Sequence, residues 1–171
     1  MSTYALRKKL VEIARKEIGT VEIGASNTGK RVVEYQRATT LEGTGWPWCA
    51  AFVCWCIREW LKDPEVRLAL NLKSDREVEA WRPKTASAWG FHEWAQKRGL
   101  LSFDDSPDHE LHTGDIITFD FSHIGLVEND DGPTVFTIEG NTNGAGSRDG
   151  GGVYDKRRPR SLARRFIRLL A

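Results

Sequence analysis

The spacing of apolar residues changes along the chain, from a helical period in the first half to alternation in the second. Early on, apolar residues recur every three to four positions, which predicts amphipathic helices. Later they alternate over short runs separated by Asp-Gly-Pro and glycine-rich turns, which predicts strands. The predicted helices span residues 3–18, 30–38, 48–61 and 85–98, with a helical turn at 65–71, and the predicted strands span residues 115–121, 123–128, 134–139, 152–155 and 164–169.

Helices that precede strands indicate an α+β fold, in which the N-terminal helices pack on a mostly antiparallel C-terminal sheet. The chain has 171 residues, 40% of them hydrophobic, which is enough to bury a sizeable core. It contains no internal repeat and no linker-like segment. We therefore expect residues 1–171 to form a single domain.

The charge balance argues against a nucleic-acid partner, because 25 Lys and Arg residues face 24 Asp and Glu residues. The stretch Lys156–Arg168 is locally basic and fits either a solvated strand face or a surface that attracts an anionic polymer. The N-terminus lacks a signal-peptide pattern, and no run of about 18 apolar residues predicts a membrane span. We expect synthesis in the cytoplasm, with free cysteine thiols, and action elsewhere only after release or delivery.

Cys49 is the strongest chemical candidate in the sequence. Gly43, Gly45 and Pro47 interrupt the chain just before it, and a helical pattern follows directly. A helix N-terminus favours an anion, so a thiol there loses its proton more easily and becomes a nucleophile. Cys54 and Cys56 lie beyond the first turn and are expected to pack in the core. The Cys-x4-Cys-x-Cys spacing does not match a structural zinc site, so no metal is expected.

A nucleophilic thiol needs a base, and the chain offers four histidines. His92 lies inside a predicted helix, and His109 and His112 lie in an acidic loop where solvated histidines are ordinary. His123 begins the apolar strand 123–128 and could face the thiol from the sheet. The alternative is that His123 is a structural strand residue.

Glu139 and Asn141 are the candidates for a third group. They lie two residues apart, which places both side chains on one face of an extended chain. Pairing of strands 123–128 and 134–139 would bring them beside His123, where a carboxylate or amide bonded to Nδ1–H would fix the imidazole tautomer. Alternatively, Glu139 is a surface charge at a strand end and Asn141 is a turn residue.

Three segments, in this order, resemble the CHAP family of peptidoglycan-cleaving cysteine hydrolases, and the resemblance spans about residues 15–155. They are Trp48-Cys49-Ala50-Ala51-Phe52-Val53, then Gly114-Asp115-Ile116-Ile117 with His123-Ile124-Gly125-Leu126-Val127, and Ile138-Glu139-Gly140-Asn141-Thr142. The resemblance implies a papain-like fold, with Cys49 as nucleophile and His123 as general base. It also implies that Glu139 orients the histidine and that Asn141 supports the polar end of the site.

Other segments are similar to a subgroup found in phage endolysins, namely Glu22–Gly29, which contains Asn27, and Gly150–Tyr154. This similarity gives Asn27 a place in the substrate groove or a structural role. Trp46 and Trp48 flank the nucleophile and are expected to line a groove that stacks on sugar or peptide. Some relatives bind calcium through aspartates that flank the cysteine. Here only Glu42 lies nearby, so the resemblance predicts no metal.

The implied reaction is hydrolysis of a peptidoglycan amide through a thioester, by an endopeptidase or an N-acetylmuramoyl-L-alanine amidase without a cofactor. The Cys49 N–H would hold the oxyanion. We expect a monomer whose partner is the peptidoglycan substrate. Two alternatives are a non-catalytic wall-binding module of the same fold and a toxin-like cysteine hydrolase that acts on another amide. A secreted toxin would imply an immunity protein as partner.

Overall fold

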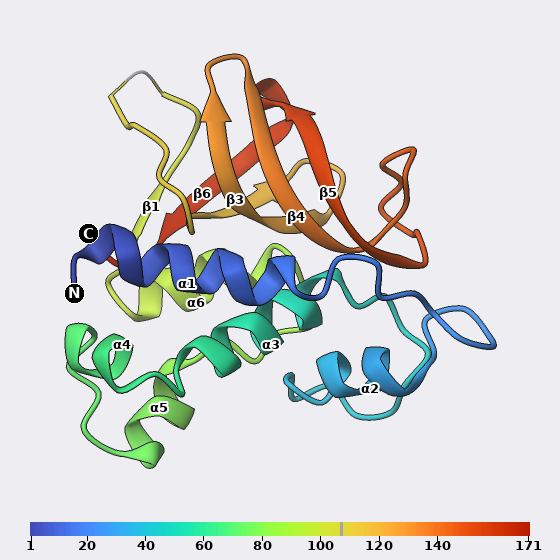
Figure 1. The fold of residues 1–171 in the computed structure, drawn as a ribbon, viewed down its shortest axis with the longest axis horizontal. Coiled ribbons are helices and arrows are strands. Elements are labelled where there is room, and N and C mark those ends of the chain that lie inside the picture. The colour runs from blue at the N-terminus through green and yellow to red at the C-terminus, as the bar shows by residue number, and fades with distance from the viewer. Residues whose placement is uncertain (107) are drawn as a thin grey trace.

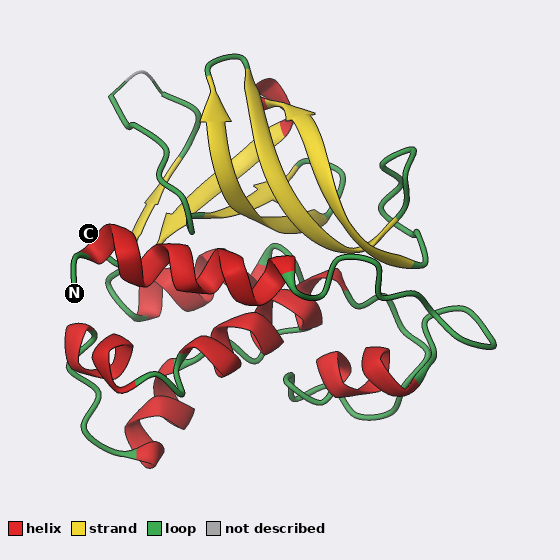
Figure 2. Cartoon of the chain, viewed as in Figure 1, coloured by secondary structure: helices red, strands yellow, loops and turns green. Residues whose placement is uncertain are grey.

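The computed structural model describes residues 1–106 and 108–171 of the chain. Over these residues α-helices form one layer and a six-stranded antiparallel sheet forms the other (Figure 1). The six α-helices precede the strands along the chain, and helices and sheet form separate parts of the molecule (Figure 2), so the expected α+β class is confirmed. The helices are α1 (Thr3–Arg15), α2 (Lys30–Gln36), α3 (Cys49–Trp60), α4 (Pro64–Ala69), α5 (Asp75–Trp81) and α6 (Gly90–Lys97).

The sheet has the strand order β1-β6-β2-β3-β4-β5, and every neighbouring pair is antiparallel. Its strands are β1 (Leu101–Phe103), β2 (Ile116–Phe119), β3 (His123–Asp131), β4 (Thr134–Thr142), β5 (Gly152–Pro159) and β6 (Ala163–Arg168), with a 3₁₀ turn at Arg160–Leu162. The central strands β3 and β4 form a hairpin, and β5 lies beside β4 at one edge of the sheet (Figure 1).

Helix α3 connects the two layers. Its residues from Cys49 to Ile57 are all buried, which fits its almost uniformly apolar sequence. The helix contacts β3 and β4 on one side and α1 and α2 on the other. Its first turn therefore lies where side chains from the two central strands can reach it. None of the helices in residues 1–106 and 108–171 is long and apolar enough to cross a membrane.

A buried ion pair joins the residue before β2 to the end of β6. Asp115 is fully buried and accepts hydrogen bonds from Arg168 Nε at 3.0 Å and Nη2 at 2.8 Å. The preceding Gly114 has φ +88°, and a Cβ there would lie 2.9 Å from the Arg7 carbonyl oxygen. The Gly-Asp pair therefore has a structural role, because it fixes β2 against α1 and β6.

The structure differs from the sequence prediction mainly at short elements. The predicted helix 85–98 begins only at Gly90, because the Thr85 and Ser87 hydroxyls accept backbone N–H bonds that form a turn instead. Helix α5 and strand β1 were not predicted, since seven and three residues carry little periodicity. Strands β3, β4 and β5 extend further than predicted.

Candidate active site

Cys49 is the first residue of α3, as the sequence predicted. The segment before it turns through Gly43 and Gly45, which have φ values of +78° and +83°. The cysteine is 7% exposed, so its side chain is largely covered but reaches the surface. Its position at the helix N-terminus places the thiol in the field of the unpaired backbone N–H groups.

His123 is the first residue of β3 and is fully buried. The tight turn between β2 and β3 contains Ser122 at φ +58°, and His123 pairs with Phe119 across the turn. The imidazole lies nearly parallel to the rings of Phe119 and Phe121, with centroids 6.1 and 5.8 Å away. These two rings therefore pack beside the imidazole at the start of β3.

The two ring nitrogens of His123 have different neighbours. Nε2 donates to Glu139 Oε2 at 2.9 Å, since an ionised carboxylate can only accept. Among the described residues, none forms a well-aligned hydrogen bond with Nδ1, and the Cys49 thiol lies beside the ring. We expected the carboxylate at Nδ1, and this expectation is wrong because the ring presents Nε2 to β4.

The pKa of His123 is raised to about 9. Burial alone would lower it, but hydrogen bonding and charge interaction with Cys49 and Glu139 outweigh burial. The imidazole is therefore charged over the neutral pH range.

Glu139 is fully buried in β4 and is surrounded by donors. Besides His123, it accepts from Thr137 Oγ1 at 2.6 Å and from Arg158 through Nε at 3.0 Å and Nη2 at 2.5 Å. Burial would raise the pKa of Glu139, but the bonds from Arg158 and His123 lower it to about 2. Glu139 is thus ionised, and it bonds the imidazole as the sequence predicted.

Asn141 lies close to these residues but does not bond the histidine. Its Oδ1 accepts from the Trp48 backbone N–H at 2.7 Å, and its Nδ2 donates to Gly150 O at 2.8 Å and Asn27 Oδ1 at 3.3 Å. The β4–β5 register shifts between Glu139 and Thr142, and Asn141 has φ +57°. The two side chains therefore point to different partners, against our expectation that they would share one face.

The residues predicted to bind substrate lie along the segment that leads to Cys49. Trp46 is partly exposed, and Asn27 is also partly exposed and donates to Gly45 O at 3.5 Å. Trp48 is fully buried, with its indole N–H on Glu22 at 2.8 Å and its ring stacked on Tyr35 at 5.4 Å. The prediction that Trp48 lines a groove is therefore wrong, because its ring presents no face to a ligand.

The other two cysteines lie deeper in α3. Cys54 and Cys56 are fully buried, and burial raises the pKa of both thiols. All three cysteines are free thiols. Across the described residues, no cluster of three or more His, Cys, Asp or Glu side chains is placed to hold a metal ion.

Arg158 is a site residue that the sequence reasoning missed. It belongs to the basic stretch Lys156–Arg168, which we interpreted as a solvated strand face or a polyanion-binding surface. The neighbouring Arg157 is exposed, whereas Arg158 is only 8% exposed and bonds Glu139. Because successive side chains of a strand point to opposite faces, the sequence could have placed the two arginines on different faces of the sheet. It does not show which of the two faces a carboxylate.

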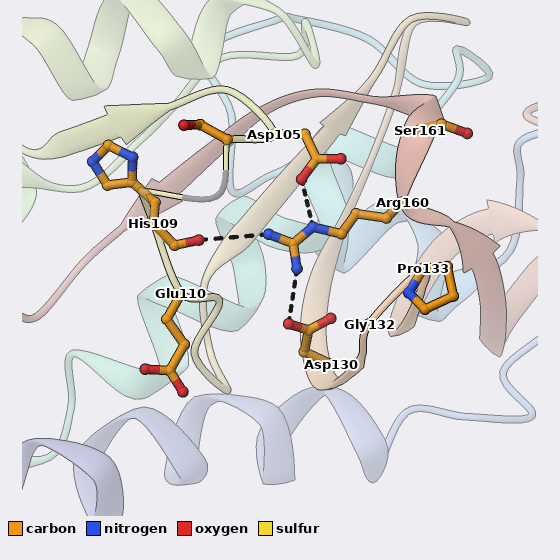
Figure 3. Close-up of a pocket in the computed structure, with 9 residues that line it drawn as sticks. Asp105, His109, Glu110, Asp130, Gly132, Pro133, Arg160 and Ser161 are labelled. Atoms are coloured by element: carbon orange, nitrogen blue, oxygen red, sulfur yellow. Dashed lines mark hydrogen bonds and ion pairs between the residues drawn. The ribbon is translucent and has the colours of Figure 1, made fainter.

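A pocket of about 670 Å³ is lined in part by Asp130, which lies at the end of β3 opposite to His123. Figure 3 shows the residues that line it. Arg160 lines this pocket and forms ion pairs with Asp105 at 2.5 Å and with Asp130 at 2.9 Å. These pairs tie the 3₁₀ turn and the loop after β1 to the end of β3. None of the predicted site residues lines this pocket.

Comparisons with known proteins indicate the family and the fold of the chain. The CHAP domain family model matches residues 41–141, which include Cys49, His123, Glu139 and Asn141. Among solved structures, that of Ly7917 matches with a TM-score of 0.50 and 17% identity over 94% of this chain and 61% of that one. Ly7917 with the hydrolyzing product of MDP matches with a TM-score of 0.51 and 18% identity over 94% and 62%. The chain thus spans about three fifths of these solved relatives. A search of curated proteins found no match.

Proposed function

Because this chain belongs to the CHAP domain family, we propose that it is a cysteine hydrolase that cleaves an amide bond of bacterial peptidoglycan. One observation supports this most directly, namely the buried His123, which lies beside the Cys49 thiol and bonds ionised Glu139. The solved relative that holds the hydrolyzing product of MDP supports a cell-wall substrate. Trp46 and Asn27, which are partly exposed, contact that substrate in this proposal.

In the first half of the reaction, the Cys49 thiolate attacks the amide carbonyl carbon. The carbonyl oxygen becomes an oxyanion, and the Cys49 backbone N–H at the start of α3 stabilises it. The imidazolium of His123 then donates its Nδ1 proton to the amide nitrogen, so that the carbon–nitrogen bond breaks and an amine leaves. The acyl group remains on Cys49 as a thioester.

In the second half, neutral His123 takes a proton from water through Nδ1, and the hydroxide attacks the thioester carbonyl. Collapse of the intermediate releases the acid and regenerates the thiolate beside the imidazolium. Glu139 stays ionised throughout and holds Nε2–H, which keeps Nδ1 directed at the reacting atoms.

Digestion of purified peptidoglycan tests this proposal. The unmodified protein should release soluble fragments, whereas Cys49→Ala should lose at least about a thousandfold in rate and remain folded. Cys54→Ala is the matched control, because that thiol is buried and has no role in the reaction. Release by Cys49→Ala at the normal rate would contradict the mechanism.

Mass spectrometry of the same digest identifies the bond. New peptide amines indicate an endopeptidase, and freed lactyl carboxylates indicate an N-acetylmuramoyl-L-alanine amidase. Both reactions would use the same cysteine, histidine and glutamate.

A further inference from the structure

Arg158 contacts Glu139 from the edge strand of the sheet. This residue lies on β5, outside residues 41–141 that the family model matches. Its guanidinium approaches Glu139 side-on, with Nε on one carboxylate oxygen and Nη2 on the other. Bidentate pairing of this kind fixes the plane of the carboxylate as well as its position.

The Arg158 guanidinium also contacts two aromatic rings and a backbone carbonyl. It lies over the rings of Phe119 and Phe121, 5.5 and 5.4 Å from their centroids, and these rings also flank His123. Its remaining Nη1 donates to Gly146 O at 3.0 Å, in the loop between β4 and β5. Arg158 therefore extends the chain of contacts that runs from Cys49 through His123 and Glu139.

The charges of these four residues must balance because the site is buried. Cys49, His123, Glu139 and Arg158 are between 0% and 8% exposed. A thiolate, an imidazolium and a carboxylate together carry one net negative charge, and such a charge is costly to bury. The guanidinium brings the total to zero.

Other charged groups around the site make different contacts. Glu22 accepts from the Trp48 indole, Arg148 donates to Phe121 O, and Lys156 donates to Asn143 O and Gly144 O. None of the three pairs with Glu139 or His123 among the described residues. Arg158 is thus the cation that contacts the carboxylate directly, apart from His123 itself.

We propose that Arg158 is a positioning residue that orients Glu139 and supplies the positive charge that lets thiolate, imidazolium and carboxylate coexist in one buried site. This inference rests on the proposed roles of Cys49 and His123. It predicts that loss of the Arg158 charge disfavours the thiolate, because the site would then carry a net negative charge.

The rate of Cys49 alkylation by iodoacetamide, measured against pH, tests this inference without using catalysis. Cys54 and Cys56 are fully buried, so only Cys49 should react. Peptide mass spectrometry of the labelled protein checks this. Arg158→Met and Arg158→Gln should move the midpoint of the profile upward by roughly one pH unit or more. The glutamine can still donate to Glu139 and is the variant better able to fold. Arg158→Lys keeps the positive charge, so its midpoint should stay close to that of the unmodified protein.

Arg157→Gln is the matched control, since Arg157 is the exposed neighbour on the same strand, and its profile should equal that of the unmodified protein. A folded Arg158→Gln protein with an unshifted midpoint would overturn the inference. The His123→Ala variant separates this outcome from failure of the proposed function. If its profile also matched that of the unmodified protein, then the pairing of Cys49 with His123 would be wrong instead.

Discussion

Asn141 Oδ1 accepts a hydrogen bond from the backbone N–H of Trp48, at 2.7 Å, and thereby holds the residue immediately before the nucleophile. The contact joins the end of β4 to the N-cap of α3 across 93 residues of sequence. Asn141 thus acts on the cysteine side of the site, whereas Glu139 acts on the histidine side.

Replacement of Asn141 by Ala should loosen the nucleophile. The buried Trp48 N–H would lose its acceptor, at a cost of about 1–3 kcal/mol in the free energy of unfolding. We expect a lower melting temperature and a reduced kcat with little change in KM, because Cys49 would no longer be held in one place. Asn143→Ala is the control, since Asn143 Oδ1 accepts from Ser147 N within the loop. Equal effects of the two substitutions would contradict this role.

The pKa values of His123 and Glu139 make stability depend on pH in a defined direction. Glu139 contributes stability above its unfolded pKa of 4.5, and this is lost as the pH falls toward about 2. His123 contributes stability below its unfolded pKa of 6.5, and this is lost as the pH rises through about 9. Denaturant titrations give the free energy of unfolding of the unmodified protein and of the double variant that carries both His123→Gln and Glu139→Gln. The difference between the two free energies should therefore be largest between about pH 4.5 and 6.5. If this difference in the free energy of unfolding stayed constant up to pH 9, the raised pKa of His123 would be contradicted.

Gly125 makes room for the Glu139 side chain. A Cβ at this position would lie 2.7 Å from Glu139 Cγ and 3.1 Å from Ile138 O. Gly125→Ala should therefore displace the carboxylate and reduce the rate of peptidoglycan release by about tenfold or more. Gly144→Ala, at a site with nothing within 4 Å, should leave the rate unchanged. Normal activity in Gly125→Ala would show that the carboxylate tolerates displacement.

Asp115 should affect stability and not chemistry. Its removal in Asp115→Ala leaves the largely buried Arg168 without its partner, at a cost of roughly 3–5 kcal/mol in the free energy of unfolding. Urea titration measures this loss. At a temperature where the variant is folded, Cys49 alkylation should keep the profile of the unmodified protein, and a shifted profile would indicate a link to the site.

Local patterns in the sequence marked Cys49 and His123 as candidates, whereas Glu139 became one through its spacing from Asn141 and the resemblance to the CHAP family. A glycine- and proline-broken segment before an apolar helix indicates the position of Cys49, and His123 is a polar residue at the start of an apolar strand. The 13-residue α1 and the apolar α3 were likewise predictable from their periodicity.

Features that depend on exact register could not be predicted in this way. The direction of Asn141 follows from a register shift and a positive φ, and the choice of Nε2 over Nδ1 follows from how the His123 ring lies against β4. The burial of Trp48 depends on Tyr35 and Glu22, which approach from other elements. Arg158 lay in a stretch whose composition suggests solvent exposure.

The position of β5 at the edge of the sheet has a consequence for the order in which the protein matures. During synthesis, Cys49 leaves the ribosome before Arg158, which lies about 109 residues later in the sequence. Until β5 adds to β4, the nascent cysteine has no complete set of buried countercharges. The thiol should therefore become reactive only after β5 has paired with β4, so the rate of Cys49 alkylation reports the addition of this strand to the sheet.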